Sequence, residues 1–249
     1  YVLGDCNEFE LIKYFNLMYK YTENYEIIVN NYSSRDNLIN CLCFKNKYKN
    51  YLEIGIEYGL TFKNIEIENK IVIDPDPKYI DDKIIKKTSD EFFIDNEITF
   101  DCIFIDGMHQ SEYVLKDLNN SIKFLNKNGM IIIDDILPLN KNEQEKIPIN
   151  HKIENNIIKY KDTSWTGDVW KVIYELLLNY KDKIKEYKYY EHKNYRGIFT
   201  FKIKEKFKIN NLNEYNFEND FSNYINLLKT EMNENEIEYY SDDFENLSE

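Results

Sequence analysis

Short apolar segments recur along the middle of the chain and alternate with segments whose apolar residues have helical spacing. The segments expected to form strands are 50–55, 70–74, 83–87, 101–106 and 130–135. Nearly all of their residues are apolar, which is typical of strands in a parallel sheet that is covered on both faces. Because predicted helices separate these strands, the pattern predicts an α/β fold with a doubly wound, mostly parallel sheet.

The helices expected between and after these strands differ in how clearly the pattern defines them. The clearest covers residues 110–127 and has one apolar stripe at helical spacing. That stripe consists of Tyr113, Leu115, Leu118, Ile122 and Leu125. Asn and Gly at 128–129 then predict a left-handed end for this helix. Shorter helices are expected over 59–66, from Ser89 onward, and from Asp168 to residue 180.

The N-terminal part of the chain lies outside this alternation. Apolar residues at helical spacing over 8–29 predict one or two helices. The sequence Ser-Ser-Arg-Asp at 33–36 predicts the N-cap of a short helix that continues to Leu42. The first residue is Tyr1 rather than Met, which leaves open that the chain is a piece of a longer polypeptide.

The segments that follow the parallel strands predict a connection, a hairpin and a tail. Residues 138–162 are polar with few periodic apolar positions, and a connection of that length is usually functional or mobile. Residues 188–192 and 197–203 predict a closing hairpin. From Glu231 onward acids dominate and no basic residue occurs, so we expect a solvated acidic tail.

Composition and charge narrow the class of protein and its partners. A hydrophobic content of 43% is compatible with a globular core. The formal net charge of -13 argues against nucleic acid and against an anionic membrane surface as partners. Four cysteines do not form a secreted disulfide framework in a chain of 249 residues. With no signal peptide and no apolar run long enough to span a bilayer, we expect a soluble cytoplasmic protein.

The segment from Tyr51 to Gly59 carries the first functional motif. An apolar strand runs directly into the turn Glu53-x-Gly55-x-x-x-Gly59, in a chain that has only seven glycines. Glycine lets the backbone of such a turn approach a nucleotide-like cofactor closely. Asp74 ends the next strand about twenty residues later, where an acid can bind ribose hydroxyls. The turn lacks the Gly-x-Gly-x-x-Gly pattern, which favours a cofactor without a pyrophosphate.

Three later motifs follow in a fixed order and carry a family resemblance. They are Ile105-Asp106-Gly107-Met108-His109, the pair Asp134-Asp135, and Trp165-Thr166-Gly167-Asp168-Val169-Trp170. Together with the Glu-x-Gly turn they resemble the class I S-adenosylmethionine-dependent methyltransferases. The resemblance is greatest to a branch of small-molecule and sugar O-methyltransferases, and it covers residues from about 48 to 200.

This resemblance implies a fold and a division of the chain. The expected fold is a Rossmann-like, mostly parallel seven-stranded sheet that ends in an antiparallel hairpin. Residues 1–47 would form an N-terminal helical extension, 48–205 the methyltransferase domain, and 206–249 a C-terminal helix with the acidic tail.

The resemblance also implies a set of cofactor contacts. The backbone from Gly55 to Gly59 would pack against the methionine portion of S-adenosylmethionine, with Glu53 near its amino group. Asp74 would bind the ribose, and Ser89 and Asp90, with Asp106, would complete the cofactor site. Two alternatives remain open, because Asp74 can simply terminate a strand and Ser89 can be the N-cap of the next helix.

Asp106, Asp134 and Asp135 form the second candidate site. Three carboxylates without a countercharge repel one another unless a cation binds between them. Ligation by oxygen alone favours Mg²⁺, Mn²⁺ or Ca²⁺ over zinc. In the methyltransferases that this chain resembles, acids at these positions hold Mg²⁺. The alternative is that Asp134 and Asp135 only cap a strand.

His109 and the two tryptophans complete the candidate residues. His109 lies three residues after Asp106, and a neutral imidazole can accept a proton from a hydroxyl near neutral pH, so these two residues are the predicted catalytic pair. We expect Trp170 in the core, whereas Trp165 either contacts the substrate or packs inside. Thr166 or Asp168 would cap the following helix.

The resulting hypothesis is an S-adenosylmethionine-dependent, magnesium-dependent O-methyltransferase that acts on a hydroxyl of a sugar or nucleotide-sugar-like molecule. Alternatives are phenolic, catechol or amine acceptors, a hydroxylase-like relative that would contain iron, and a non-catalytic cofactor-binding module of a larger protein. The sequence leaves open a homo-oligomer and a place within a longer multidomain chain.

Overall fold

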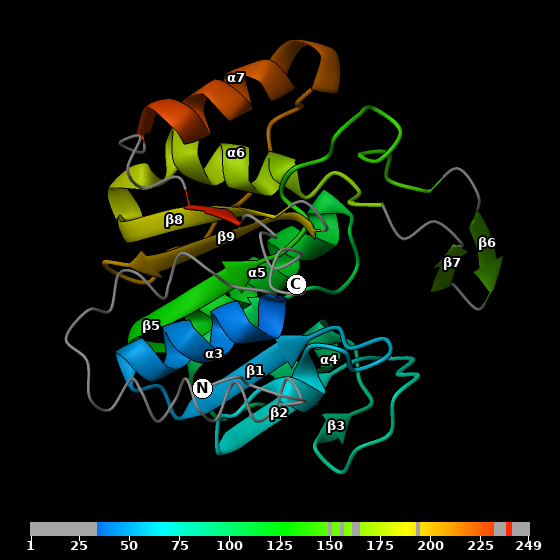
Figure 1. Cartoon of the computed structure of the whole chain (residues 1–249), viewed down its shortest axis with the longest axis vertical. Helices are drawn as coiled ribbons and strands as arrows, with labels where there is room; N and C mark the ends of the chain where they lie inside the picture. Colours follow the sequence, from blue (N-terminus) through cyan, green and yellow to red (C-terminus); the bar gives the residue numbers. More distant parts are fainter. Residues whose placement is uncertain are drawn as a thin grey trace, which may run out of the picture.

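The computed structural model describes residues 34–148, 151–154, 157–160, 165–192, 195–231 and 238–240. Eight strands form one sheet (Figure 1): β1 (Asn50–Ile54), β2 (Asn69–Ile73), β3 (Ile84–Ile85), β4 (Phe100–Ile105), β5 (Leu125–Ile133), β8 (Ile184–His192), β9 (Tyr195–Ile203) and β10 (Glu238–Tyr240). The helices are α3 (Arg35–Asn46), α4 (Ser89–Ile94), α5 (Ser111–Phe124), α6 (Trp170–Asn179) and α7 (Phe217–Glu231). No helix in these ranges is long and apolar enough to cross a membrane.

The sheet confirms the predicted doubly wound, Rossmann-like fold. Its order is β10-β8-β9-β5-β4-β1-β2-β3, and β1 to β5 are parallel to one another. β9 is antiparallel to β5, and β8 is antiparallel to β9, as expected of the closing hairpin. β10 adds a short eighth strand beside β8, beyond the seven that were predicted. The strand order reverses between β1 and β4, which is where ligands bind in open sheets of this type.

Alternate residues of the central strands supply the two faces of the core. Leu52, Ile103 and Ile131 lie on the face covered by α4, α5 and α6, whereas their neighbours Tyr51 and Cys102 lie on the face covered by α3. Since successive side chains of a strand point to opposite faces, continuous apolar strands are needed to fill both layers. This explains why the strand segments of the sequence are apolar at almost every position.

The predicted helices differ from the observed ones mainly in their limits. α5 ends at Phe124 rather than at residue 127, because Leu125 already pairs with Phe100 at the start of β5. Asn128 does adopt a left-handed conformation, at φ 66°, but inside β5, where the strand register shifts. In the predicted stripe Tyr113 is wrong, because 44% of its surface is exposed and Val114 is buried in its place.

Several shorter segments also depart from the prediction or lie beyond it. The expected helix over 59–66 is a turn with one short 3-10 helix, η1 (Phe62–Asn64). A second 3-10 helix, η2 (Lys181–Lys183), precedes β8. The polar connection contains an unpredicted antiparallel pair, β6 (His151–Glu154) with β7 (Ile157–Tyr160), which Figure 1 shows apart from the main sheet. The helices expected over 8–29 lie outside the described residues.

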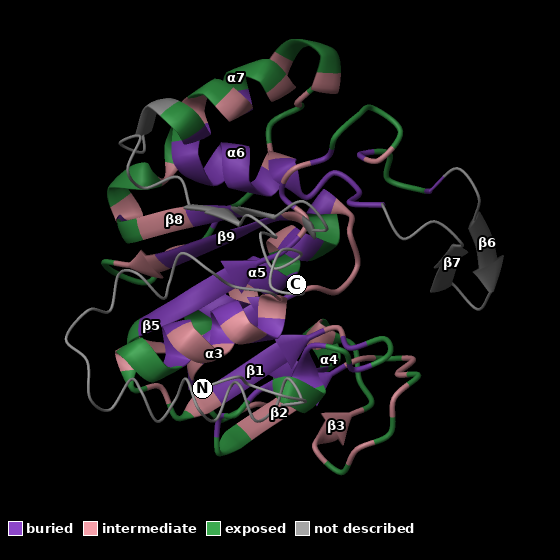
Figure 2. Cartoon of the chain, in the orientation of Figure 1, coloured by how far each residue is buried: buried purple, intermediate pink, exposed green. Residues whose placement is uncertain are grey.

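An aromatic cluster joins the last two helices to the sheet. The Trp170 side chain at the start of α6 is fully buried, as the sequence predicts, and its ring lies 5.3 Å from Phe221 and 5.7 Å from Tyr224 of α7. Figure 2 shows α6 buried beneath α7, whose outer face is exposed. Burial of large aromatic rings at this junction stabilises the C-terminal side of the domain.

We therefore expect Trp170→Ala to lower the free energy of unfolding by about 3–5 kcal/mol, because it removes a fully buried ring from this cluster. Leu178→Ala is the matched control on the same helix, since 47% of Leu178 is exposed; it should cost less than about 0.5 kcal/mol. Urea denaturation followed by circular dichroism measures both. Equal losses for the two variants would show that α7 is not held through Trp170.

Candidate functional site

The turn after β1 touches the segment that follows β4. Gly55 has a φ of +90°, and a Cβ atom added to it would lie 2.2 Å from the carbonyl oxygen of Asp106. The Asp106 amide in turn donates a 2.9 Å hydrogen bond to the Ile54 carbonyl. Glycine is therefore required at this position both for its conformation and for the close approach. The two sequence motifs meet directly at the point where the strand order reverses.

Asp74 organises this turn through backbone hydrogen bonds. Its Oδ2 accepts from the amides of Ile56 at 2.9 Å and Glu57 at 3.3 Å, and its Oδ1 accepts from the Asp76 amide at 2.7 Å. Glu57 is held at a φ of +42° within the same turn. The carboxylate thus does more than terminate β2, because it fixes the shape of the candidate cofactor loop. Its contact with a ribose stays a prediction.

Glu53 lies inside the protein, beneath the turn. Its residue surface is 2% exposed, and its Oε2 accepts a 2.6 Å hydrogen bond from the Tyr51 hydroxyl. Burial, with a smaller contribution from the negative charge of Asp106, raises the pKa of Glu53 from 4.5 to about 8, against the opposing effect of the Tyr51 hydrogen bond. The carboxyl is therefore mostly protonated at neutral pH, and the predicted contact with a cofactor amino group stays a prediction.

Ser89 and Asp90 lie at the start of α4. The N-cap is Thr88, which forms a capping box with Glu91, so the interpretation of Ser89 as N-cap is wrong. The Ser89 hydroxyl donates instead to the buried carboxylate of Asp117 on α5. Asp90 is half exposed and accepts from the Asn120 amide at 3.3 Å. The proposed adenine contacts of Ser89 and Asp90 remain predictions.

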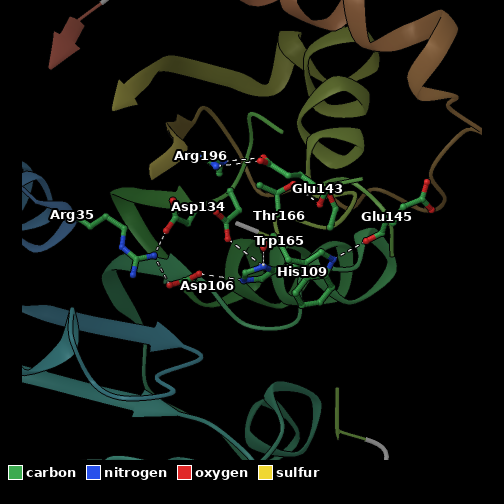
Figure 3. A network of polar contacts seen from close by, with 11 residues as sticks. Arg35, Asp106, His109, Asp134, Glu143, Glu145, Trp165, Thr166 and Arg196 are labelled. Atoms are coloured by element: carbon green, nitrogen blue, oxygen red, sulfur yellow. Dashed lines mark hydrogen bonds and ion pairs between the residues drawn. The ribbon is translucent and has the colours of Figure 1, made fainter. Parts of the chain in front are cut away.

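The three predicted acids do come together, but with a countercharge that the sequence analysis did not anticipate. Asp106 follows β4, and Asp134 and Asp135 follow the adjacent strand β5, so the carboxyl ends of the two strands bring them side by side. Figure 3 shows Arg35 of α3 reaching into this group. Its Nη1 donates to Asp106 Oδ2 at 2.8 Å and also to Asp134 Oδ2. The premise of three unpaired carboxylates was therefore wrong for Asp106 and Asp134.

His109 lies on the other side of Asp106, within the same group. Its Nε2 is 3.5 Å from Asp106 Oδ1, and its Nδ1 is 3.2 Å from Asp135 Oδ2 and 2.9 Å from the Trp165 carbonyl oxygen. A carbonyl oxygen can only accept, so Nδ1 carries a proton and Nε2 is the nitrogen with basic character. Asp135 has a φ of +59°, a strained conformation that is typical of functional sites.

One donor atom from each of Asp106, His109 and Asp135 lies within 4.8 Å of the others, close enough to bind a single ion. Two carboxylates and an imidazole suit a divalent cation. Asp134 is directed toward Arg35 instead, and its buried Oδ1 has no hydrogen-bond partner among the described residues. The residues present fit a metal ion, although the sequence analysis did not propose His109 as a donor.

The charges of this group shift the pKa values of its members. Burial opposes ionisation of Asp106, yet Arg35 and His109 hold its pKa below the ordinary value. Burial raises the pKa of Asp135 to about 7, since His109 offsets the effect only in part and both neighbouring aspartates add to it. Burial also opposes the charge on His109, but Asp135 and Asp106 raise the His109 pKa to about 9. The imidazole is consequently protonated at neutral pH as the site stands.

The tryptophan-containing motif is packed against His109. The Trp165 and His109 rings stack with centroids 4.9 Å apart, and a Cβ atom on Gly167, whose φ is +59°, would overlap the His109 carbonyl oxygen at 1.5 Å. Trp165 is only 6% exposed, and its Nε1 donates to the Glu145 carbonyl at 2.7 Å. Only glycine allows this approach, so the motif fixes the position of the histidine.

The expected cap of the following helix was wrong. Asp168 caps α5, because its Oδ1 accepts from the Ser111 amide at 2.7 Å and its Oδ2 from the Ser111 hydroxyl at 3.0 Å. The hydroxyl of Thr166 donates to the Glu143 carbonyl at 3.0 Å. The N-cap of α6 is Val169, which makes no side-chain cap. The motif therefore binds the connection to the start of α5, directly after His109.

A second ion pair holds the connection over this motif. Arg196 of β9 donates from Nε and Nη2 to the two carboxylate oxygens of Glu143, at 2.8 and 3.1 Å. The Glu143 carbonyl also accepts from the amides of Thr166 and Gly167. The sequence did not reveal Arg35 as a member of the acid-histidine group, or the pair of Glu143 and Arg196 that lies outside that group and holds the connection. The available signal was the rarity of arginine, because Arg35 and Arg196 are the two arginines of the chain.

The buried Glu53 carboxyl predicts a pH dependence of stability. Because its pKa rises from 4.5 in the unfolded chain to about 8 in the folded one, the folded state binds one more proton between these values. This contribution is fully present below pH 4.5 and is lost as pH rises toward 8, by at most about 1.4 kcal/mol per pH unit.

Glu53→Gln removes this titration, so the stability of the wild type relative to the variant should fall over this range and then level off. Thermal unfolding of both proteins at a series of pH values measures the difference. A difference that stays constant with pH would contradict the assignment of a protonated Glu53.

One family model and several solved structures are similar to this chain. Residues 73–136 match the model of a protein family described as a methyltransferase domain. No curated protein matches the sequence. Among solved structures, cofactor-bound Rv0187 from MTB is similar over 82% of this chain and 93% of that chain, at 10% identity and a TM-score of 0.51. The O-methyltransferase TomG from Streptomyces achromogenes, in complex with SAM, is similar over 81% and 92%, at 10% identity and a TM-score of 0.50.

The family match covers the segment from the end of β2 to just beyond β5, which contains Asp74, Asp106, His109 and the pair Asp134 and Asp135. The similarity to solved structures extends over most of the chain and concerns the fold. Both findings support the class I methyltransferase resemblance of the sequence, without identifying its branch. The family model thus matches one segment of the chain, and the two solved structures share its fold.

Proposed function

We propose that the protein is an S-adenosylmethionine-dependent O-methyltransferase that uses Mg²⁺ and acts on a hydroxyl of a sugar or nucleotide-sugar-like molecule. One observation carries the proposal: the glycine turn and the acid-histidine group share the same edge of the sheet, in direct backbone contact. The Asp106 amide donates to Ile54, and Gly55 has no room for a side chain against Asp106. A methyl donor on the turn would therefore lie next to groups that can activate an alcohol.

The turn supports the choice of methyl donor. Asp74 fixes its backbone, Glu53 lies buried beneath it, and the turn follows the strand at the switch point, where ligands bind in this fold. TomG, which shares the fold, was crystallised with SAM. When bound, S-adenosylmethionine supplies its methyl group as part of a positively charged sulfonium.

Two sets of residues could hold the cation: the acid triad expected from the sequence and the observed group of Asp106, His109 and Asp135, whose donor atoms lie within 4.8 Å of one another. Asp106 and Asp135 belong to both sets. The third donor is Asp134 in the triad and His109 in the observed group. A bound divalent cation lowers the pKa of a coordinated hydroxyl and so favours its ionisation.

His109 is the proposed proton acceptor. The Trp165 carbonyl fixes the proton on Nδ1 and leaves Nε2 to accept the proton of the acceptor hydroxyl. Asp106, 3.5 Å from Nε2, stabilises the imidazolium that results. Asp135 and Asp106 raise the His109 pKa to about 9, and positive charge held by the same carboxylates would lower it toward the range of a general base.

The acceptor class is inferred from the resemblance to sugar O-methyltransferases and from the donor set. A cation held by carboxylates suits two neighbouring hydroxyl groups, which both sugars and catechols have. Methylation assays with nucleotide sugars, catechols and amines as parallel acceptors discriminate these classes. A non-catalytic module would bind the cofactor and give no product with any of them.

Binding of S-adenosylhomocysteine tests the cofactor claim. We expect the wild type to bind it, and Asp74→Asn to weaken binding by about tenfold, because the one amide oxygen of Asn cannot accept from both the Ile56 and the Asp76 amides, as the two carboxylate oxygens do. Asp76→Asn is the control, because Asp76 donates to Asp74 through its backbone amide, which the substitution keeps, and its affinity should stay within about twofold. Isothermal titration gives all three constants. Failure of the wild type to bind would remove the proposed cofactor.

Chelation and a ligand variant test the metal claim. Asp135→Asn should reduce turnover by at least about tenfold, since it removes a carboxylate from the cation site. A chelator should abolish wild-type turnover, and added Mg²⁺ should restore it. Asp182→Asn, an exposed acid far from the site, serves as the control. Wild-type turnover that is insensitive to the chelator would rule out the role of Mg²⁺.

A further inference from the structure

Arginine is used sparingly in this chain, and both copies hold carboxylates next to the candidate site. The 249 residues include 32 lysines and arginines, of which only Arg35 and Arg196 are arginines. Arg196 clamps Glu143, and Arg35 contacts Asp106 and Asp134. A guanidinium offers a planar fork of donors that an ammonium group lacks. The presence of arginine at only Arg35 and Arg196 indicates that both positions serve to bind carboxylates.

The local structure around Arg35 does not favour a cation. Arg35 is the first residue of α3, where the helix dipole disfavours positive charge, and Ser34 makes no side-chain cap. The side chain reaches across to the ends of β4 and β5 and is 21% exposed there. The position of this arginine is therefore explained by its contacts with Asp106 and Asp134 at the ends of β4 and β5, and not by the requirements of the helix.

The Arg35 guanidinium lies where a cation shared by Asp106 and Asp134 would have to bind. A single nitrogen, Nη1, contacts one oxygen of each carboxylate. The Asp134 side chain is only 2% exposed, so a cationic partner is needed to stabilise its ionised form. Even so, its other oxygen has no hydrogen bond from any part of the chain that the structure describes. Arg35 thus satisfies this buried carboxylate only in part.

Two arrangements of the cation site follow, depending on Arg35. With Arg35 in place, the third donor beside Asp106 and Asp135 is His109. A histidine that coordinates the cation through Nε2 cannot also accept a proton there. If Arg35 leaves, Asp134 becomes available, all three donors are oxygens, as Mg²⁺ prefers, and His109 is left as a base.

We propose that Arg35 is a resident counterion of the cation site and that a divalent metal ion displaces it from Asp106 and Asp134. Guanidinium and metal are then mutually exclusive on these two carboxylates. Arg35 keeps the buried Asp134 paired while the metal is absent, and Asp134 rather than His109 completes the ligand set when it binds. This inference rests on the metal dependence in the proposed function and specifies its ligands.

Titration of Mn²⁺ into four variants of the full chain tests the proposal. Arg35→Gln should bind Mn²⁺ at least about tenfold more tightly than the wild type, because the competing cation is gone. Asp134→Asn should bind at least about tenfold more weakly, and His109→Gln should stay within about twofold. Arg196→Gln is the matched control, since its arginine pairs with Glu143 outside the cation site, and it should match the wild type.

The opposite pattern overturns the proposal: weaker binding in His109→Gln, unchanged binding in Asp134→Asn, and no gain in Arg35→Gln. If Arg35→Gln does not fold, the comparison of Asp134→Asn with His109→Gln decides the question alone. Titration of S-adenosylhomocysteine into the same samples separates this inference from the cofactor claim. Retained cofactor binding without Mn²⁺ binding in any variant would refute the counterion role and leave the cofactor claim standing.

Discussion

The charge balance of buried carboxylates at one edge of the sheet governs the architecture of this site. β1, β4 and β5 place Glu53, Asp106 and the pair Asp134 and Asp135 within one small region. Glu53 responds by remaining protonated, whereas Asp106 and Asp134 share a guanidinium and Asp135 pairs with His109. The carboxyl groups are stabilised in different ways because each has different partners within contact distance. A site assembled in this way is suited to bind further positive charge.

The fold was predictable wherever one physical rule dominated. Apolar strands covered on both faces and an amphipathic α5 follow directly from side-chain burial, so the sheet, its parallel strands and the closing hairpin emerge from the pattern. The first and last residues of each element were less predictable. Leu125, for example, was expected near the end of α5 but pairs with Phe100 as the first residue of β5. The β6 and β7 pair carries no clear alternation in a polar segment, so local pattern did not reveal it.

The site was predictable in its acids and histidine but not in their partners. Asp106, His109, Asp134 and Asp135 are close in space because the ends of neighbouring strands are, which sequence order indicates. Arg35 and Asp168 act across long stretches of sequence, on Asp134 and on Ser111, and no local rule connects such pairs. Asp74 was predicted to bind the ribose or to terminate β2. Its hydrogen bonds to the backbone of the Gly55–Gly59 turn were not predicted.

The central claim is that a methyl donor and a divalent cation bind next to each other at this edge of the sheet. A crystal structure of the chain grown with S-adenosylhomocysteine and Mn²⁺, with the anomalous signal of manganese recorded, tests it most directly. The account predicts the cofactor on the turn between Gly55 and Gly59 and a manganese peak beside Asp106 and Asp135. Cofactor bound away from the turn, or manganese confined to surface acids, would contradict it.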